Sequence, residues 1–405
     1  MNAPILYFLF CVSVIVISLL TMTGCGEKER PAPRDSLKQL EVNFEQSKAK
    51  QGDMVAQYNL GHKYAIGDGV WIDMAEAAKW LRKAAQQDYP PAQYMIGMLL
   101  INGHATANQE GEAEKWIRQA AEQQHPDAEF VMGLLYDQGK LVPKDVMEAG
   151  KWILKAAEHG QIDAQHAAGN MFCQGIDGMT QDYTKAAKWF RKAAEQGKAT
   201  SQLEIGSLYV MGEGVPKDAQ EAVRWLSKSA VQGIAVAQYN LGAMYGRGEG
   251  VLQDATQAAV WYRKAADQGL AVAQFTLGMI YREGQGVDKN EVKAAEWMRK
   301  AAEQGYSMAQ IMLGVMYADG LGVAMDSVEG FAWLSLGAER FATEKKARPS
   351  EIGLELSAVM LAASRPYDKA APRRLERLKD ELTPEQMAEA QKRISQFKER
   401  TQVKR

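Results

Sequence analysis

The fold is decided by one segment, residues 237–269, which reads AQYNLGAMYGRGEGVLQDATQAAVWYRKAADQG. Apolar residues in its first third recur at helical spacing on one face, so this part predicts an α-helix. A pair of glycines then breaks the helix, and Asp254 with Gln257 three residues later is a capping box that opens a second helix. Gly269 is typical of a helix end. The segment therefore predicts one helix–turn–helix unit.

The same unit recurs along the middle of the chain with a period of 36 residues, interrupted once by a spacing of 37. The repeated glycines are Gly61, Gly97, Gly133, Gly169, Gly206, Gly242, Gly278 and Gly314. The repeated tryptophans, eight of the nine in the chain, are Trp80, Trp116, Trp152, Trp189, Trp225, Trp261, Trp297 and Trp333. Because two residue types keep one period for so long, the sequence predicts eight stacked repeats, none of which folds alone.

This pattern resembles the Sel-1-like repeat family, relatives of the tetratricopeptide repeats, from about Gly52 to Ala338. The resemblance implies an all-α fold, a right-handed alpha-alpha solenoid of about eight 36-residue helix-turn-helix repeats with helical caps. The first helices of such a solenoid line its concave surface. Repeat two has Ala105 and Thr106 in place of Gly and Val, and repeat four has an extra residue near Asp177, so we expect altered turns there.

Helical caps are predicted on both sides of the array. Phe44 and Gly52 occupy the Trp and Gly places of a half-unit, and Thr383 starts a helix in a motif that resembles the endings of many family members. The expected organisation is a signal peptide over residues 1–24, a tether over 25–35, an N-terminal capping helix over 36–51, the repeats over 52–340 and a C-terminal helical cap over 341–405.

The amino-terminal segment predicts export. Residues 5–20 are an apolar run shorter than a typical membrane span, and small residues follow it before Cys25. This resembles a lipoprotein signal, which implies cleavage before Cys25 and lipidation of that cysteine. Gly26 stands where such lipoproteins use Asp for inner-membrane retention, which implies a periplasmic protein tethered to the outer membrane. The alternative is an inner-membrane signal anchor, because Met22 is unusual in the motif and no Lys or Arg precedes the run.

Composition narrows the class of protein. Hydrophobic residues make up 46% of the chain and charged residues 24%, which indicates a folded protein with a packed core. The net charge of -2, without a basic stripe interleaved with aromatics, argues against nucleic-acid binding. Three cysteines, one of them in the predicted signal, cannot form a disulfide framework, so the fold must depend on packing.

A candidate partner groove follows from the geometry of the first helices. At about 100 degrees per residue, positions two before, one after and five after the repeat glycine lie opposite the apolar face. The candidate groove residues are Asn59, His62, Met95, Met98, Asn102, Val131, Leu134, Gln138, Asn170, Gln174, Glu204, Asn240, Arg247 and Glu283. We expect Met95, Met98, Val131 and Leu134 to form an apolar floor for a peptide or helix, with amide side chains bonding its backbone. The alternative is that these side chains pack between helices.

No catalytic residue, cofactor or metal site is predicted. The recurring glycine pairs lie in helix–helix turns rather than after a strand, so they do not indicate a phosphate loop. The five histidines occupy different repeat positions, without a second histidine one turn away, and Cys173 is expected to be an inert, partly buried thiol. Cysteine-rich members of the family that bind penicillins have a disulfide in most repeats, which this chain lacks.

The sequence therefore favours a non-enzymatic, lipid-anchored interaction scaffold that binds a protein partner on the concave face. The alternative is a binder or weak hydrolase of beta-lactams or cell-wall fragments, which would need a small enclosed polar pocket rather than an open groove. The sequence leaves the identity of the partner and the oligomeric state open.

Overall fold

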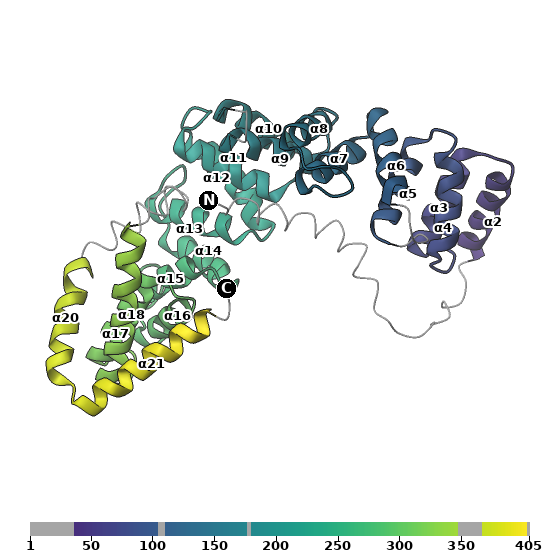
Figure 1. The fold of residues 1–405 in the computed structure, drawn as a ribbon. Coiled ribbons are helices and arrows are strands. Elements are labelled where there is room, and N and C mark those ends of the chain that lie inside the picture. Colours follow the sequence, from purple (N-terminus) through teal and green to yellow (C-terminus); the bar gives the residue numbers. More distant parts are fainter. Residues whose placement is uncertain (1–35, 104–109, 176–179, 347–366, 403–405) are drawn as a thin grey trace. The chain divides into compact units, whose positions relative to one another are not determined.

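The computed structural model describes residues 36–103, 110–175, 180–346 and 367–402. Within these ranges every regular element is a helix, which confirms the all-α prediction (Figure 1). The chain divides into two compact units, residues 1–123 and 124–405. The altered turns expected near Ala105 and Asp177, and the lipid signal with Cys25, lie outside the described residues.

Each unit is a series of helices in which every helix from the first to the last repeat packs against the next one along the chain. The helices of the first unit are α2 (Ser36–Lys50), α3 (Met54–Ile66), α4 (Met74–Ala85), α5 (Pro90–Ile101) and α6 (Glu110–Glu122). From α3 to α6 they form two successive pairs, and α2 precedes the first pair. The described helices of this unit therefore amount to two helix–turn–helix repeats behind one leading helix.

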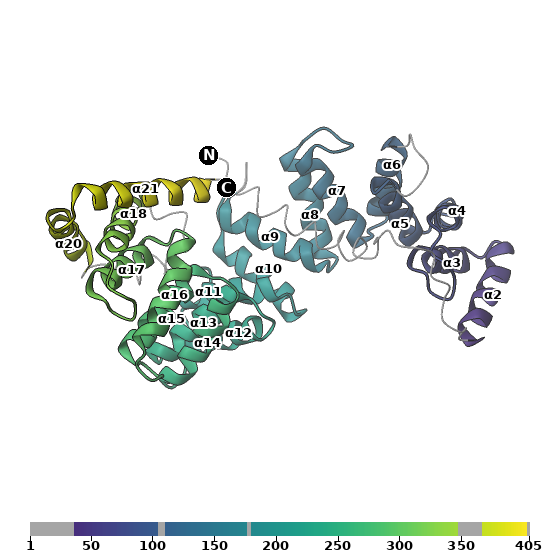
Figure 2. The same ribbon diagram turned by 90° about the horizontal axis from the view of Figure 1, so that it is seen from below.

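The second unit contains six further repeats and two additional helices (Figure 2). Its repeat helices are α7 (Pro126–Gln138), α8 (Val146–Glu158), α9 (Ile162–Gln174), α10 (Tyr183–Glu195), α11 (Ala199–Met211), α12 (Ala219–Val231), α13 (Ala235–Arg247), α14 (Ala255–Asp267), α15 (Ala271–Glu283), α16 (Glu291–Glu303), α17 (Ser307–Asp319) and α18 (Ser327–Lys346). The additional helices are α20 (Tyr367–Glu381) and α21 (Pro384–Gln402), which both pack on α18. The arrangement is that of an α-solenoid. Below, the first helix of a repeat is its A helix and the second its B helix.

Most B helices begin at a side-chain cap, as the capping box at Asp254 and Gln257 predicts for its repeat. Asp254 accepts the backbone N–H of Gln257 at 2.9 Å. The caps of the other B helices with the same arrangement are Asp73, Asp145, Asp182, Asp218, Asn290 and Asp326. A cap of this kind satisfies a backbone donor that has no partner inside the helix and stabilises it by about 1 kcal/mol. Each of these seven B helices therefore has a start that is specified locally.

The repeat glycines bring the two helices of one repeat into close contact. A Cβ on Gly206 would lie 2.9 Å from Cγ of Leu226, and a Cβ on Gly314 would lie 2.7 Å from the backbone nitrogen of Leu334. In both repeats the neighbour is the residue that follows the repeat tryptophan. A methyl group at these positions would force the A and B helices apart, which explains why the period is carried by glycine.

Six of the eight repeat tryptophans are more than nine-tenths buried, and the other two, Trp116 and Trp261, are half-buried. Trp225 is 4% exposed, and the Lys228 ammonium lies 4.4 Å from the centre of its ring. The same Lys–Trp pair occurs in α4, α8, α10, α14 and α16. In α18 the place of the lysine is occupied by Leu336, and Phe397 of α21 meets the Trp333 ring edge-on with the ring centres 5.0 Å apart.

A ladder of buried glutamines joins neighbouring repeats, and the sequence patterns did not predict it. Its members lie four residues before the repeat glycine and are Gln57, Gln93, Gln165, Gln202, Gln238, Gln274 and Gln310. Gln274 illustrates the geometry: its Nε2 donates to the Ala266 carbonyl at 3.1 Å, and its Oε1 accepts Nε2 of Gln304 at 2.8 Å. Gln304 also donates to the carbonyl of Gly269 at 2.9 Å. One buried amide thus links the end of the preceding B helix, its own A helix and the end of the following B helix.

The third repeat departs from this ladder. Glu129 occupies the glutamine place and is 1% exposed, and its Oε2 lies 2.7 Å from Nδ1 of His159, which stands where the other repeats have the second glutamine. Repeat three therefore has a pair of titratable groups where the other repeats have a pair of uncharged amides.

The turn of repeat three differs as well. Leu141 stands where most repeats have the second turn glycine, and it still adopts the left-handed φ of 62°.

Replacing Gln274 by Leu should lower the free energy of unfolding by about 2 kcal/mol, because the Gln304 amide and the buried Ala266 carbonyl each lose a partner. Gln220→Leu is the matched control, since Gln220 is exposed on α12 and its substitution should cost less than about 0.5 kcal/mol. Urea denaturation followed by circular dichroism measures both. Equal, small effects of the two substitutions would show that the ladder does not stabilise the stack.

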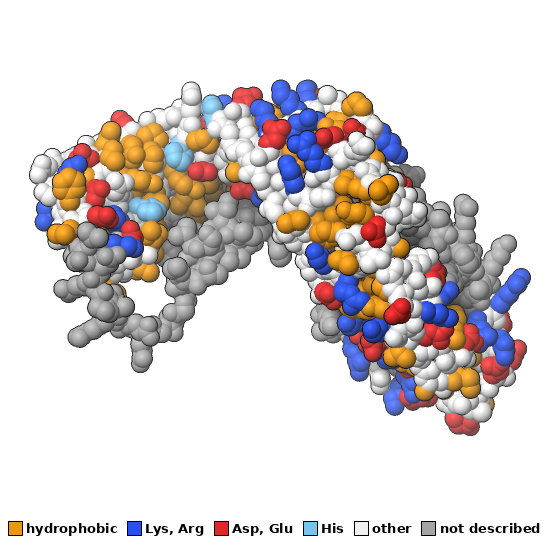
Figure 3. Space-filling model, turned by 180° about the vertical axis from the view of Figure 1, so that it is seen from behind, with side chains coloured by type: hydrophobic (Ala, Val, Ile, Leu, Met, Phe, Trp, Pro, Cys, Tyr) orange, Lys and Arg blue, Asp and Glu red, His pale blue; other side chains and the backbone are white. Residues whose placement is uncertain are grey.

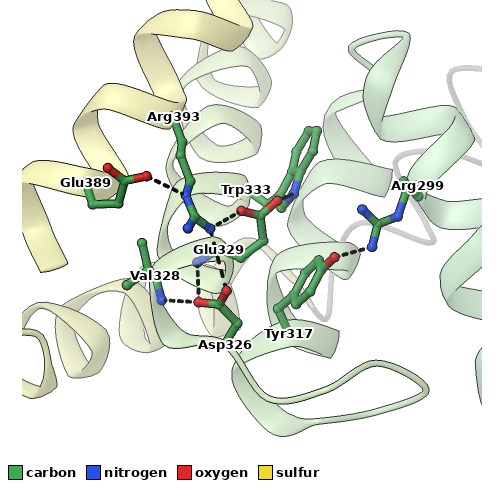
Figure 4. Close-up of polar contacts among 8 residues, drawn as sticks. All are labelled: Arg299, Tyr317, Asp326, Val328, Glu329, Trp333, Glu389 and Arg393. Carbon is green, nitrogen blue, oxygen red and sulfur yellow. Dashed lines mark hydrogen bonds and ion pairs between the residues drawn. The ribbon is translucent and has the colours of Figure 1, made fainter.

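The two additional helices cover the last repeat with apolar contacts and ion pairs. Leu378 of α20 and Ala390 of α21 are buried. The Arg393 guanidinium on α21 lies 2.6 Å from Glu329 and 3.5 Å from Asp326, both at the start of α18 (Figure 4). Arg393 also pairs with a glutamate of its own helix. Arg393 therefore helps to hold α21 against the last repeat.

Candidate partner-binding surface

The positions two before, one after and five after each repeat glycine on the A helices define a surface that we call the A-helix stripe. In the first unit its members are partly buried. Asn59 donates to Glu45 of α2 at 3.3 Å, and the His62 ring stacks on Tyr58 with the ring centres 6.2 Å apart. Met95 packs against the apolar core of this unit, whereas Met98 and Asn102 are half-buried on α5.

In the second unit the stripe begins on α7. Leu134, expected on the groove floor, is 8% exposed and packs inside the unit, whereas Val131 and Gln138 are half-buried. Met95 and Met98 belong to the first unit, and Val131 and Leu134 belong to the second. The four-residue apolar floor therefore stays a prediction, and a Leu134→Asp variant would place a carboxylate in the core rather than at a surface.

Farther along the second unit the stripe is more polar. Asn170, Glu204 and Asn240 are half-buried, and Gln174, Arg247 and Glu283 are exposed. Asn170 is committed to its own helix, because its Nδ2 lies 3.2 Å from Nε2 of His166. The sequence placed these side chains opposite the apolar face of their helices, and none of them is among the buried residues of the structure.

Side-chain contacts hold several successive A helices next to one another. Nδ1 of His166 on α9 lies 2.9 Å from the Ser201 hydroxyl on α11. The side chains of Tyr239 on α13 and Thr276 on α15 are hydrogen-bonded. Arg282 on α15 lies 3.6 Å from the sulfur of Met312 on α17, and Met312 itself is buried. Side chains on α9 and α11, and on α13 to α17, are therefore held side by side.

Burial sets the protonation of three groups near the stripe. Burial lowers the pKa of His166 to about 4, with the nearby Lys198 contributing in the same direction, so this imidazole is neutral near pH 7. Burial raises the pKa of the Cys173 thiol to about 12, which leaves it as an unreactive thiol. Burial also raises the pKa of the Glu204 carboxyl to about 7. Of the three, Glu204 changes charge near neutral pH.

A separate shallow pocket of about 340 Å³ lies at one edge of the second unit. It is lined by Pro126, Asp127, His159, Gly160, Gln161, Ile162, Asp163 and Gln196. Asp163 is already paired with Lys198 at 2.5 Å, and Asp127 accepts the Gln161 amide at 3.4 Å. In the part of the chain that the structure describes, no group of three or more His, Cys, Asp or Glu is placed to hold a metal ion.

The family to which these repeats belong follows from their sequence. The Sel1 repeat family model matches eight consecutive segments, at residues 55–89, 90–125, 126–161, 162–198, 199–234, 235–270, 271–306 and 307–340. The chain belongs to the Sel1 repeat family. This agrees with the resemblance drawn from the spacing of glycine and tryptophan. Sel1 repeat proteins generally mediate protein–protein interactions, and their solenoid is typically a non-enzymatic scaffold.

Two solved Sel1 repeat structures cover most of the chain. A protective antigen of uropathogenic Escherichia coli strains displaying an SLR fold is 29% identical, with a TM-score of 0.51, over 84% of this chain and 97% of its own. A Sel1 repeat protein from Oxalobacter formigenes is 32% identical, with a TM-score of 0.54, over 80% of this chain and 96% of its own. No match to a curated protein was found.

Among the residues that the structure describes, no helix combines the length and the hydropathy that crossing a bilayer requires.

Proposed function

We propose that this Sel1 repeat protein is an exported scaffold that binds a protein partner on the A-helix stripe of its second unit. The observation that carries the proposal is the polar, partly exposed run of Gln174, Glu204 and Asn240 on successive A helices. None of these three side chains makes a hydrogen bond or an ion pair with another residue that the structure describes. Amide side chains on a preformed helical surface can bond the backbone of a peptide, and such a surface is ordered before it binds.

The same proposal includes where the protein is found, which is outside the cytoplasmic membrane. The apolar run at residues 5–20 followed by Cys25 supports export and lipidation, and Gly26 supports a tether to the outer membrane in the periplasm. An inner-membrane signal anchor is the other form of attachment that the sequence allows. Both place the repeats outside the cytoplasmic membrane, where the partner would be found.

The double variant Gln174→Arg with Asn240→Arg should reduce capture of the partner at least about tenfold, because two long cations on the stripe block the approach of a peptide backbone. Both residues are on helix surfaces, so far-UV circular dichroism should be unchanged. The measurement is affinity capture of the full chain from crosslinked intact cells, quantified by mass spectrometry.

The matched control is Val231→Arg with Leu252→Arg, which adds the same charge at residues that are 76% and 92% exposed outside the stripe. A protein captured by the parent and by the control, but not by the stripe variant, supports the proposal. Equal capture by all three proteins would place the interaction elsewhere on the chain.

A further inference from the structure

Most charged side chains of the A-helix stripe in the second unit have a polar or charged partner within the chain. Arg247 lies 3.5 Å from Glu249, and Glu283 accepts Nε2 of Gln285 at 2.7 Å. Asp319 is paired with Arg374 of α20. The carboxylate of Glu204 on α11 is different, because it makes no hydrogen bond or ion pair with any residue that the structure describes.

The surroundings of Glu204 make this isolation costly. The side chain is partly buried, and burial alone raises the pKa of its carboxyl to about 7, so no described cation is close enough to counter the effect. The one titratable neighbour whose charge couples to it is the Cys173 thiol on α9, which stays neutral because its pKa is about 12. A carboxylate removed from water without a partner destabilises the free protein, and such groups concentrate at functional sites.

We propose that Glu204 is the anchor for a Lys or Arg side chain of the protein partner. The inference rests on the proposed function and adds the chemistry of the partner to it. On the next A helix of the stripe, Asn240 has a half-buried amide that could bond the backbone of a bound peptide while one cationic side chain of the peptide pairs with the Glu204 carboxylate. A long Lys or Arg side chain can reach a carboxylate that is partly buried.

The test uses random linear peptides displayed on phage and selected on the full chain in detergent. Peptides that bind the parent but not the Gln174→Arg, Asn240→Arg double variant define the stripe-dependent set. Within this set we expect Lys or Arg at one fixed position. Representative peptides should bind Glu204→Gln at least about tenfold more weakly and should lose more affinity to Glu204→Lys. A second selection on Glu204→Lys should exchange the cationic position for Asp or Glu.

Binding should also respond to pH. Since the carboxyl is ionised above its pKa of about 7, the selected peptides should bind the parent more tightly at about pH 8 than at about pH 6, and Glu204→Gln should lose this difference. The three proteins must share one circular dichroism spectrum, and Glu204→Gln remains informative if Glu204→Lys fails to fold.

The outcomes separate the two proposals. Stripe-dependent peptides without a fixed cation, or with equal affinity for the parent and Glu204→Gln, would overturn the anchor while leaving the partner surface in place. Selection of no stripe-dependent peptide would overturn both.

Discussion

Replacing Gly250 by Ala should lower the free energy of unfolding by roughly 2 to 4 kcal/mol, whereas Gly269→Ala should lower it by about 1 kcal/mol. The two glycines belong to the same repeat, and both adopt left-handed backbone, with φ of 71° and 88°. A Cβ on Gly250 would overlap the carbonyl of Ala219 at the start of α12, whereas nothing lies within 4 Å of a Cβ on Gly269. The difference between the variants therefore measures the fit of one repeat's turn against the preceding B helix.

Urea denaturation followed by far-UV circular dichroism measures both substitutions. The glycines corresponding to Gly250 in the neighbouring repeats, Gly214, Gly286 and Gly322, meet the preceding B helix in the same way, so the result should transfer to them. If Gly250→Ala and Gly269→Ala lose the same stability, the conformational preference of glycine would explain both, and the close fit between repeats would contribute nothing.

Replacing Glu204 by Gln should raise the free energy of unfolding by about 2 kcal/mol at about pH 8 and leave it nearly unchanged at about pH 4. The sign follows from the raised pKa: the carboxyl titrates at about 7 in the folded chain and near its ordinary value of 4.5 in the unfolded chain. Below the lower value the group is neutral in both states. Between about pH 4.5 and 7 the unfolded chain ionises the carboxyl while the folded chain keeps it protonated, so the folded state loses stability across this window, and the loss is absent from the glutamine variant.

The control for this measurement is Glu195→Gln, because Glu195 is exposed at the end of α10. Its substitution should change the free energy of unfolding by less than about 0.5 kcal/mol at either pH. Denaturation curves of the parent and both variants at the two pH values give the comparison. A Glu204→Gln variant that is less stable than the parent at the higher pH would show that the carboxylate has a stabilising partner.

Much of the fold follows from local sequence signals. The Asp254 cap, the repeat glycines and the repeat tryptophans each act within one repeat or between adjacent ones, and their period identifies the family. The glutamine ladder could not be predicted in this way. Gln274 and Gln304 are polar residues thirty positions apart, and their pairing is visible only when two repeats are stacked.

Helical geometry predicted only in part which side chains of the A helices are exposed. Helical geometry placed Asn240 and Glu204 opposite the apolar face of their helices, and the structure leaves both partly exposed. The same geometry could not distinguish Leu134, which is drawn into the core because an apolar side chain gains free energy by packing wherever neighbouring helices allow it. The sequence also could not predict that Glu204 lacks a charged partner, because this depends on which Lys and Arg side chains the neighbouring helices place close to it.

The central claim, that the A-helix stripe of the second unit binds a protein partner, is tested most directly by photo-crosslinking in living cells. A photoreactive amino acid is placed at Asn240 on the stripe in one strain and at Leu252, which is 92% exposed off the stripe, in another. The account predicts a protein adduct of one defined mass from position 240 and none of that mass from position 252. The same adduct from both positions, or none from position 240, would contradict it.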